Sequence, residues 1–349
     1  MSNARPKVFI AGVGMITAVG ANAETTTAAV NAGISAFRDS VHFNKNFNPM
    51  RMALIPEDAL PPLNPDKVSI AGLTSRERRM LRLATPALEE VMQSVPLTVR
   101  PPLFLAVSES VPDCPSIIQP GFIDHLVAQT GIKIDRAASR MIATGRAGGL
   151  QAIDLAFKYF ESTGKDVALV GGVDTYLDSF LLGVLDSQDR ILAENIQDGF
   201  APGEAAGFLM LVSERVVDKL PNKALAALYA PGLAEESGHR YSQEPYLGDG
   251  LSRAFQLAIE NAGGQPIHTI YASLNGEQFS AKELGVASIR NKGALVDDFE
   301  VVHPADCFGD IGAAFAPVMI GMTGKSRLSN TLCYCASEQA YRGAVYVTQ

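Results

Sequence analysis

Apolar runs alternate along the chain with stretches whose hydrophobic positions recur at helical spacing. Apolar runs predict strands at 7–16, 102–110, 138–144, 166–175 and 203–214. Amphipathic stretches between them predict helices at 23–33, 76–95, 121–131 and 148–163, two of which close on Gly33 and Gly131. Strands alternating with helices in this way are typical of layered α/β domains.

A second, weaker series of elements follows in a similar order. It comprises a strand and turn at 223–234, a helix at 248–264, a strand at 269–277, a strand–loop–helix unit at 299–322, and the closing strands TLCYCA and GAVYVT. We therefore predict an α/β fold built from two duplicated halves with mixed sheets. The halves span residues 1–217 and 218–349, with the join near 215–222.

The composition and net charge of the chain exclude some classes of function. The 349 residues are 47% hydrophobic and 19% charged, with a net charge of −8, which argues against general nucleic-acid binding. No run of 18 apolar residues predicts a membrane span, and the start has no signal-peptide pattern, so we expect a cytoplasmic protein with free thiols. The basic cluster at 74–82 is either a solvated helix face or a docking patch for an acidic partner.

Neither a metal nor a cofactor is expected. The four cysteines lack the paired spacing of metal ligands. The GVG at 12–14 lacks the rest of a dinucleotide fingerprint, so a tight turn after a strand is preferred.

Several motifs together resemble the β-ketoacyl synthases of the thiolase-like superfamily. The opening at 8–37, the loop HFNKNFNPMRMA at 42–53, the Gly-Gly strand at 167–177 and DGFAPGEAAGFLML at 198–211 carry the resemblance in the first half. IYASLNGE and CFGDIGAAFAPV carry it more loosely in the second. The resemblance implies a five-layered thiolase-like fold. It also implies a homodimer in which an edge strand, here 138–144 or its neighbour, extends the sheet across a two-fold axis.

The chain departs from this family where the family places its chemistry. The resemblance implies a nucleophilic cysteine at a helix N-terminus and two histidines that assist decarboxylation of the malonyl group. These positions fall on Arg146, Asn275 and Asp310. A lysine of the family falls on Ala305, and its Gly-rich gating loop falls on 337–343. A guanidinium stays protonated at ordinary pH and cannot attack a thioester, so no catalytic residue is assigned.

The three replacements are chemically compatible with one another. An arginine at a helix N-terminus meets the positive end of the dipole, and burying it unpaired costs several kcal/mol. We therefore predict that Asp310 lies within salt-bridge distance of Arg146, with Asn275 beside both, in a pocket smaller than a working ketosynthase needs. Two interpretations remain open, a structural plug and a site for an anionic or polar ligand.

Other residues are candidates to line the same site, namely Thr144, Cys307, His303, Phe200 and Ser108. Cys307 and His303 lie four residues apart and could form a reactive thiolate pair, or Cys307 could simply be a small buried hydrophobic side chain. Thr144 and Ser108 act as nucleophiles only with an adjacent base, and the sequence shows none.

Three functions follow as expectations. The first is a catalytically inactive ketosynthase-like scaffold or adaptor, of the kind found beside bacterial secretion genes, including effector-loading modules of type VI systems. The second is a partner subunit of an active ketosynthase, similar to a chain-length factor. The third is a 3-oxoacyl-[acyl-carrier-protein] synthase or acyltransferase with relocated chemistry. The corresponding partners are a secretion effector, a ketosynthase or an acyl-carrier protein, and function must be argued from the site rather than from the fold.

Overall fold

A computed structural model describes the chain apart from residues 1–5, 66–67, 69–71, 95–98, 116 and 326–329. Within the described residues, eleven strands form one mixed sheet. Its first half contains β1 (Lys7–Thr17), β4 (Leu103–Ala106), β5 (Arg140–Ile142), β6 (Val167–Thr175) and β7 (Glu204–Ser213). Its second half contains β8 (Ala226–Tyr229), β9 (Gly232–Glu235), β10 (Ile267–Ala272), β11 (Leu295–Val302), β12 (Thr331–Ala336) and β13 (Tyr341–Thr348). The predicted α/β fold with mixed sheets is confirmed.

The strand order of the first half is repeated in the second. In the first half the order is β1-β7-β6-β4-β5, and in the second it is β8-β13-β12-β10-β11. In both halves the first two pairings are antiparallel and the last two are parallel. Antiparallel pairing of β1 with β8, from Lys7↔Tyr229 to Ile10↔Ala226, joins the halves into one sheet. This repeat is what a duplicated unit would produce.

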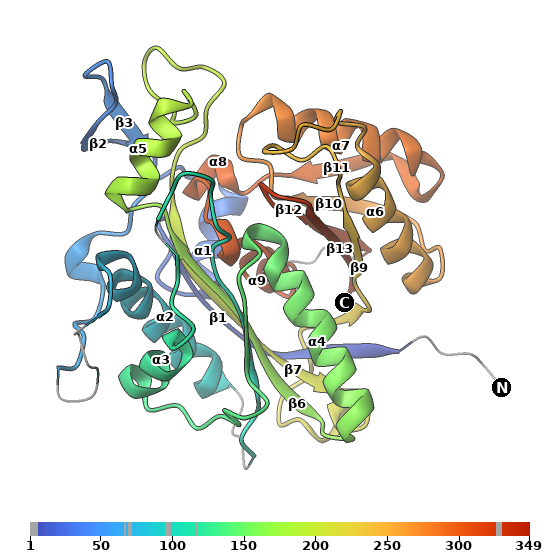
Figure 1. The fold of residues 1–349 in the computed structure, drawn as a ribbon. Coiled ribbons are helices and arrows are strands. Elements are labelled where there is room, and N and C mark those ends of the chain that lie inside the picture. Colours follow the sequence, from blue (N-terminus) through green and yellow to red (C-terminus); the bar gives the residue numbers. More distant parts are fainter. Residues whose placement is uncertain (1–5, 66–67, 69–71, 95–98, 116, 326–329) are drawn as a thin grey trace.

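The helices form three layers around the two halves of the sheet. They are α1 (Ala23–Asn31), α2 (Ser75–Ser94), α3 (Phe122–Thr130), α4 (Gly148–Thr163), α5 (Ser179–Ser187), α6 (Asp249–Ala262), α7 (Gln278–Arg290), α8 (Ala305–Phe308) and α9 (Phe315–Thr323). Helices α4 and α9 contact each other and lie between the two halves, in the same core as residues of β1, β7, β12 and β13 (Figure 1). Helices α2 and α3 cover the outer face of the first half, and α6 and α7 lie on the second. The five-layered arrangement places α4 and α9 at the centre.

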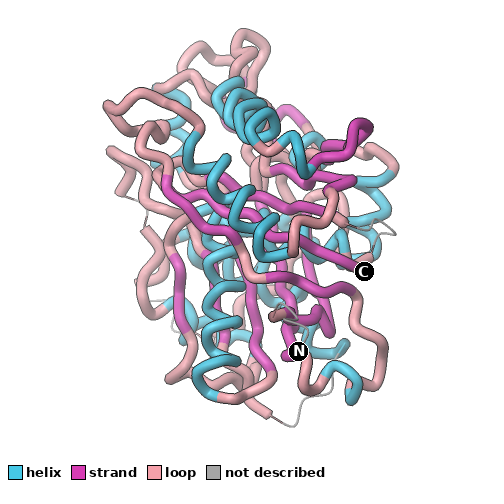
Figure 2. Tube along the Cα trace, turned by 90° about the vertical axis from the view of Figure 1, so that its right-hand side faces the viewer, coloured by secondary structure: helices cyan, strands magenta, loops and turns pink. Residues whose placement is uncertain are grey.

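Figure 2 shows the strands running through the interior with helices on either side. Short 3-10 turns occur at Glu57–Ala59, Gly145–Ala147, Val217–Lys219, Lys292–Ala294 and Gly312–Ala314. The turn at Val217–Lys219 lies between β7 and β8, in the segment where the join was predicted. In the part of the chain that the structure describes, no helix has the length and apolar character needed to span a membrane.

Some elements differ from the sequence prediction. The strand predicted at 102–110 ends earlier, at Ala106, and its last contact with the sheet is the hydrogen bond from Val107 N–H to the carbonyl of Ile142 in β5. The hairpin of β2 (Arg38–Phe43) and β3 (Pro49–Met52) and the helices α5 and α7 were not predicted. In β2 the exposed side chains include two apolar ones, Val41 at 85% and Phe43 at 58%, so its pattern does not indicate a buried face.

Arg78 of the basic cluster at 74–82 is exposed, but the other three arginines form neither a solvated face nor a free docking patch. Arg76 is buried, and its guanidinium lies 2.9 Å from the carboxylate of Asp174. Arg79 donates to the buried carboxylate of Glu204 and to Glu57, and Arg82 also pairs with Glu57. The cluster therefore holds α2 against the sheet and the preceding loop.

Candidate functional site

Two matching turns place the candidate site between the halves of the molecule. The turn at Gly145–Ala147 enters α4, and the turn at Gly312–Ala314 enters α9. Gly145 has φ +65° and Gly312 has φ +51°, a backbone region that L side chains rarely adopt. A Cβ on either glycine would also collide with a carboxylate, that of Glu109 at 2.4 Å and that of Asp174 at 2.1 Å.

Each half of the molecule contributes a side chain that accepts a hydrogen bond from the turn of the other half. Ser337, which follows β12 in the second half, accepts a hydrogen bond from the N–H of Ala147 through its hydroxyl at 3.0 Å. Asp174, on β6 in the first half, accepts from the N–H of Ala313 at 3.0 Å. These contacts satisfy backbone donors that a helix start leaves unpaired, and they fix the position of Arg146 at the centre.

Arg146 forms the predicted ion pair with Asp310. Its Nε lies 3.2 Å and 3.1 Å from the two carboxylate oxygens, and Nη2 contacts Oδ2. Both residues are buried, Asp310 completely. Burial alone would lower the pKa of Arg146, but the charges around it, first that of Asp310, outweigh burial and raise that pKa above its ordinary value. The guanidinium therefore stays charged and paired.

Asn275 lies beside both partners, as predicted. Its amide nitrogen donates to Asp310 Oδ2 and to Glu277 Oε2, each at 2.9 Å. Asp310 also accepts from the N–H of Gly312 at 2.9 Å. The Asp310 carboxylate thus has donors from Arg146, Asn275 and the turn before α9, so its negative charge is well satisfied.

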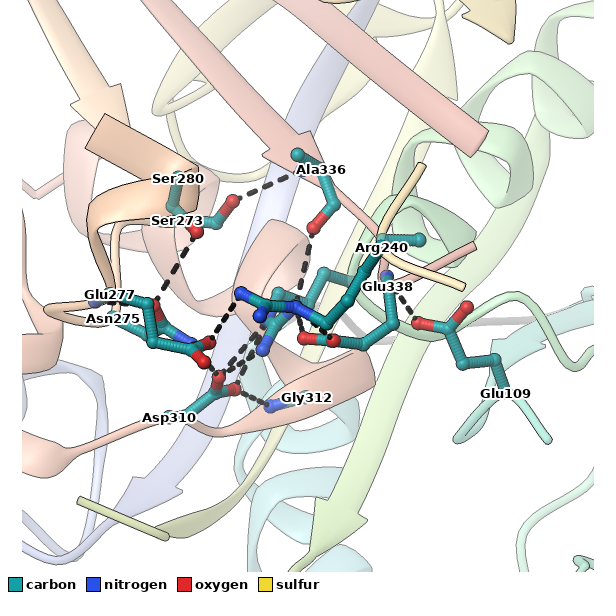
Figure 3. A network of polar contacts seen from close by, with 12 residues as sticks. Glu109, Arg240, Ser273, Asn275, Glu277, Ser280, Asp310, Gly312, Ala336 and Glu338 are labelled. Carbon is teal, nitrogen blue, oxygen red and sulfur yellow. Dashed lines mark hydrogen bonds and ion pairs between the residues drawn. The ribbon is translucent and has the colours of Figure 1, made fainter. Parts of the chain in front are cut away.

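Four further residues extend the pair into a network that the sequence analysis missed (Figure 3). They are Arg190, Arg240, Glu277 and Glu338. Arg190 donates to both oxygens of Glu277 at 2.7 Å each and lies 2.9 Å from Glu338. Arg240 bridges the same two carboxylates at 3.1 Å and 3.0 Å, and Arg146 Nη1 donates to Glu338 at 2.7 Å.

The network balances its charges. Three guanidiniums, of Arg146, Arg190 and Arg240, face the three carboxylates of Asp310, Glu277 and Glu338. Burial would raise the pKa of Glu338, yet the three arginines outweigh burial and lower it. Two of the four had a sequence signal: Glu338 lies in the segment 337–343 that matches the family's gating loop, and Glu277 ends the motif IYASLNGE.

The cavity beside this network is small. Its volume is about 30 Å³, room for about two water molecules, whereas ligand pockets are typically 300–1,000 Å³. Ser108 and Phe200 line it, as predicted, together with Arg146 and Glu338. Ser108 Oγ is buried and has no hydrogen-bond partner among the described residues.

Thr144, His303 and Cys307 do not line this cavity. Thr144 donates its hydroxyl to Gln151 at 2.9 Å. Of the two interpretations of Cys307, the thiolate pair with His303 does not form, because the exposed His303 ring instead contacts Asp306 at 2.6 Å. Cys307 is buried in the core, and burial together with the nearby Asp306 charge raises the pKa of its thiol. It is therefore a small apolar side chain rather than a thiolate.

No group of three or more His, Cys, Asp or Glu side chains within the described residues is arranged to hold a metal ion. Cys114, Cys307, Cys333 and Cys335 are free cysteines. The polar groups at the centre instead bind one another.

Comparison with known proteins gives the class of the fold. The solved structures that this chain matches include "The ishigamide ketosynthase/chain length factor". The TM-score is 0.78 and the identity 17%, over 99% of this chain and 100% of that one. A β-ketoacyl synthase from Burkholderia phymatum STM815 matches with a TM-score of 0.76 and 16% identity over 99% and 100% of the two chains. The fold is thus the thiolase-like fold of the ketosynthases.

Sequence matches cover part of the chain. The model of the β-ketoacyl synthase N-terminal domain matches residues 132–216. A 3-oxoacyl-[acyl-carrier-protein] synthase 2 from Staphylococcus aureus is 26% identical over 196 residues, which cover 51% of this chain and 48% of that protein. The alignment thus spans about half the length of the curated relatives that this chain matches. This chain is therefore similar to β-ketoacyl synthases in sequence over these segments and in fold along its length.

Proposed function

We propose that this protein does not condense acyl groups and acts by binding other proteins, as a scaffold or adaptor with a ketosynthase fold. The observation that carries the proposal is the two-point ion pair of Arg146 with Asp310 at the entrance to the central helix. Acyl transfer needs a nucleophile at such a position, and a paired guanidinium has no electron pair to donate.

The surroundings support the same conclusion. An oxyanion site needs free donors directed at the reacting oxygen, but the donors of Arg146 and Asn275 are directed at Asp310, Glu277 and Glu338. The cavity of about 30 Å³ has no room for an acyl chain. Ser108, the hydroxyl on its wall, has no partner in the described residues that would act as its base.

Intact-mass measurement after incubation with acyl-CoA and acyl-carrier protein tests the proposal. We expect no covalent acyl adduct and no decarboxylation of a malonyl carrier protein. The single variant Arg146→Cys should remain unable to condense, because both histidine positions are still replaced. The triple variant Arg146→Cys, Asn275→His, Asp310→His restores all three family positions. It is therefore the first variant in which condensation would be expected. A stable adduct on Cys307 of the natural protein would refute the proposal and support relocated chemistry.

A chain-length-factor-like partner subunit is the second candidate. It is favoured by the fold match along the full chain to the ishigamide ketosynthase/chain length factor. The test is co-purification with an intact ketosynthase from the same gene set, followed by light scattering. A 1:1 complex whose product length changes when this chain is exchanged would favour this role over an independent scaffold.

The remaining alternative, an adaptor of a type VI secretion system, makes a different prediction about partners. It requires binding of a secretion effector or a system component, and secretion genes beside this gene. Carrier-protein and ketosynthase genes in that neighbourhood would instead favour the partner-subunit role. In every case the fold supplies a rigid surface rather than a reactive centre.

A further inference from the structure

The carboxylate of Glu338 lies where three arginine side chains meet. It is 2.7 Å from Arg146 Nη1, 2.9 Å from Arg190 Nη2 and 3.0 Å from Arg240 Nε. These three arginines, which we call the arginine socket, come from the turn before α4, the loop after α5 and the loop between β9 and α6. Glu338 comes from a fourth segment, between β12 and β13. One side chain of a loop therefore fills a site that three other segments build.

Two arginines of the socket are held in place by further contacts. Arg190 donates to both oxygens of Glu277, and its guanidinium lies over the ring of Phe200, 5.4 Å from the ring centre. Arg240 also pairs with Glu277, and its guanidinium lies over the ring of Phe279 at 4.8 Å. Stacking on an aromatic face fixes the plane in which a guanidinium presents its N–H groups. The donors of the socket are therefore positioned without help from the group that they bind.

The charge of the socket favours an anion. Arg146 keeps its two-point contact with Asp310 when Glu338 is absent. The three guanidiniums would then face only the carboxylates of Asp310 and Glu277, and one positive charge would remain without a partner in the network. An uncompensated charge at a buried position is costly, so an external anion that restores the balance would bind favourably.

The backbone around Glu338 is held independently of its carboxylate. Glu109 accepts hydrogen bonds from the N–H of Glu338 at 2.8 Å and of Gln339 at 3.0 Å. The hydroxyl of Ser337 accepts from the N–H of Ala147 at 3.0 Å. Removal of the Glu338 side chain should therefore leave the loop in place and the socket open.

We propose that the arginine socket is a binding site for a carboxylate anion and that Glu338 is its built-in occupant. A planar carboxylate matches the donor geometry of guanidinium groups. An external carboxylate enters when the Glu338 side chain swings out, and it competes with a group whose effective concentration is high because it belongs to the same chain. The side chain of Arg240 is 21% exposed, so the socket reaches the surface there. The site rests on the proposed function, because it assigns a ligand to a centre that performs no acyl transfer.

Rescue of Glu338→Ala by acetate tests the site. Alanine lacks Cγ, Cδ and both carboxylate oxygens, and these are the heavy atoms of acetate. Chemical denaturation at pH 7 compares the variant in about 100 mM sodium acetate with the variant in sodium chloride of the same concentration. We expect acetate to lower the unfolding equilibrium constant of the variant about tenfold, as a ligand does at about ten times its Kd. The natural protein should show no such difference, because Glu338 already fills the socket.

Three controls separate the socket from general effects of salt. Acetamide has the shape of acetate without its charge and should not rescue Glu338→Ala. Glu57→Ala removes another carboxylate that pairs with two arginines, Arg79 and Arg82, but is 70% exposed, so acetate should not stabilise that variant. Addition of Arg240→Gln to Glu338→Ala should weaken the response to acetate, because one donor of the socket is lost.

The outcomes decide between the site and its absence. If Glu338→Ala does not fold in chloride, recovery of folded protein on refolding in acetate replaces the titration. Equal effects of acetate and chloride, an equal response of Glu57→Ala, an undiminished response with Arg240→Gln, or failed recovery in acetate would overturn the site. A covalent acyl adduct would instead refute the proposed function and leave the acetate result intact.

Discussion

Arg146 and Asp310, 164 residues apart in the chain, form an ion pair that joins the two halves of the molecule at its centre. Each residue lies at the turn that enters one of the two central helices. A pair in this position has two consequences. It occupies the positions that the resemblance to β-ketoacyl synthases assigns to the nucleophile and one of the histidines, and it makes the packing of α4 and α9 depend on a satisfied charge.

Removal of the acidic partner should therefore destabilise the protein strongly. We expect Asp310→Ala to lower the free energy of unfolding by about 3–5 kcal/mol, because the substitution leaves the buried Arg146 charge without its main partner. Chemical denaturation monitored by circular dichroism measures the effect. Asp249→Ala is a matched control that breaks the exposed pair with Arg290, at 2.6 Å, and should cost less than about 1 kcal/mol. Equal effects of the two substitutions would show that the central pair is not a structural requirement.

The pH dependence of stability should carry the signature of Glu109. Its pKa is about 7 in the folded protein and about 4.3 in an unfolded chain, so the folded state prefers the protonated form. The stability that this preference contributes is fully present below pH 4.3 and is lost as pH rises through 7, about 4 kcal/mol in total. Denaturation of the natural protein and of Glu109→Gln across pH 5–8 measures the difference. A stability difference that does not change with pH would contradict the raised pKa.

The ion pair of Arg146 with Asp310 could be predicted from the sequence. A buried arginine needs an opposite charge nearby, and another of the replaced positions, Asp310, supplies one. Most of the helices and the duplicated order followed from periodicity and glycine stops. Arg190, Arg240 and Glu277 could not be predicted in the same way. They come from loops without periodic pattern, and only the folded chain brings Arg190 within 2.7 Å of Glu277, a residue 87 positions away.

One error has an equally local cause. The run 102–110 looked like a continuous strand, but β4 ends at Ala106, and Ser108 and Glu109 line the cavity at the site. The spacing of four residues left a thiolate pair of Cys307 with His303 open beside the interpretation of Cys307 as a small buried side chain. The short helix α8 instead brings Asp306 to the His303 ring, at 2.6 Å, while Cys307 enters the core.

Phe47 gives a prediction about backbone strain. It lies in the tight turn between β2 and β3 with φ +62°, and its side chain is 86% exposed. Asparagine tolerates this backbone region better than phenylalanine, and little buried surface is lost on replacement. We expect Phe47→Asn to raise the free energy of unfolding by about 0.5–1 kcal/mol. Phe43→Asn, on β2 in an ordinary strand conformation and 58% exposed, is the control and should give no gain.

The last prediction concerns assembly through β5. This strand stands at one end of the sheet and pairs only with β4 among the described strands, so its outer edge presents backbone donors and acceptors without strand partners. Arg140 on this edge is exposed, whereas Met141 and Ile142 are half-buried. We propose that two copies pair β5 with β5 about a two-fold axis, which would remove two open edges at once. Light scattering at micromolar concentration should then give twice the mass of one chain. A monomer over that range would exclude this assembly and would leave β5 available to a different subunit, as the chain-length-factor-like role requires.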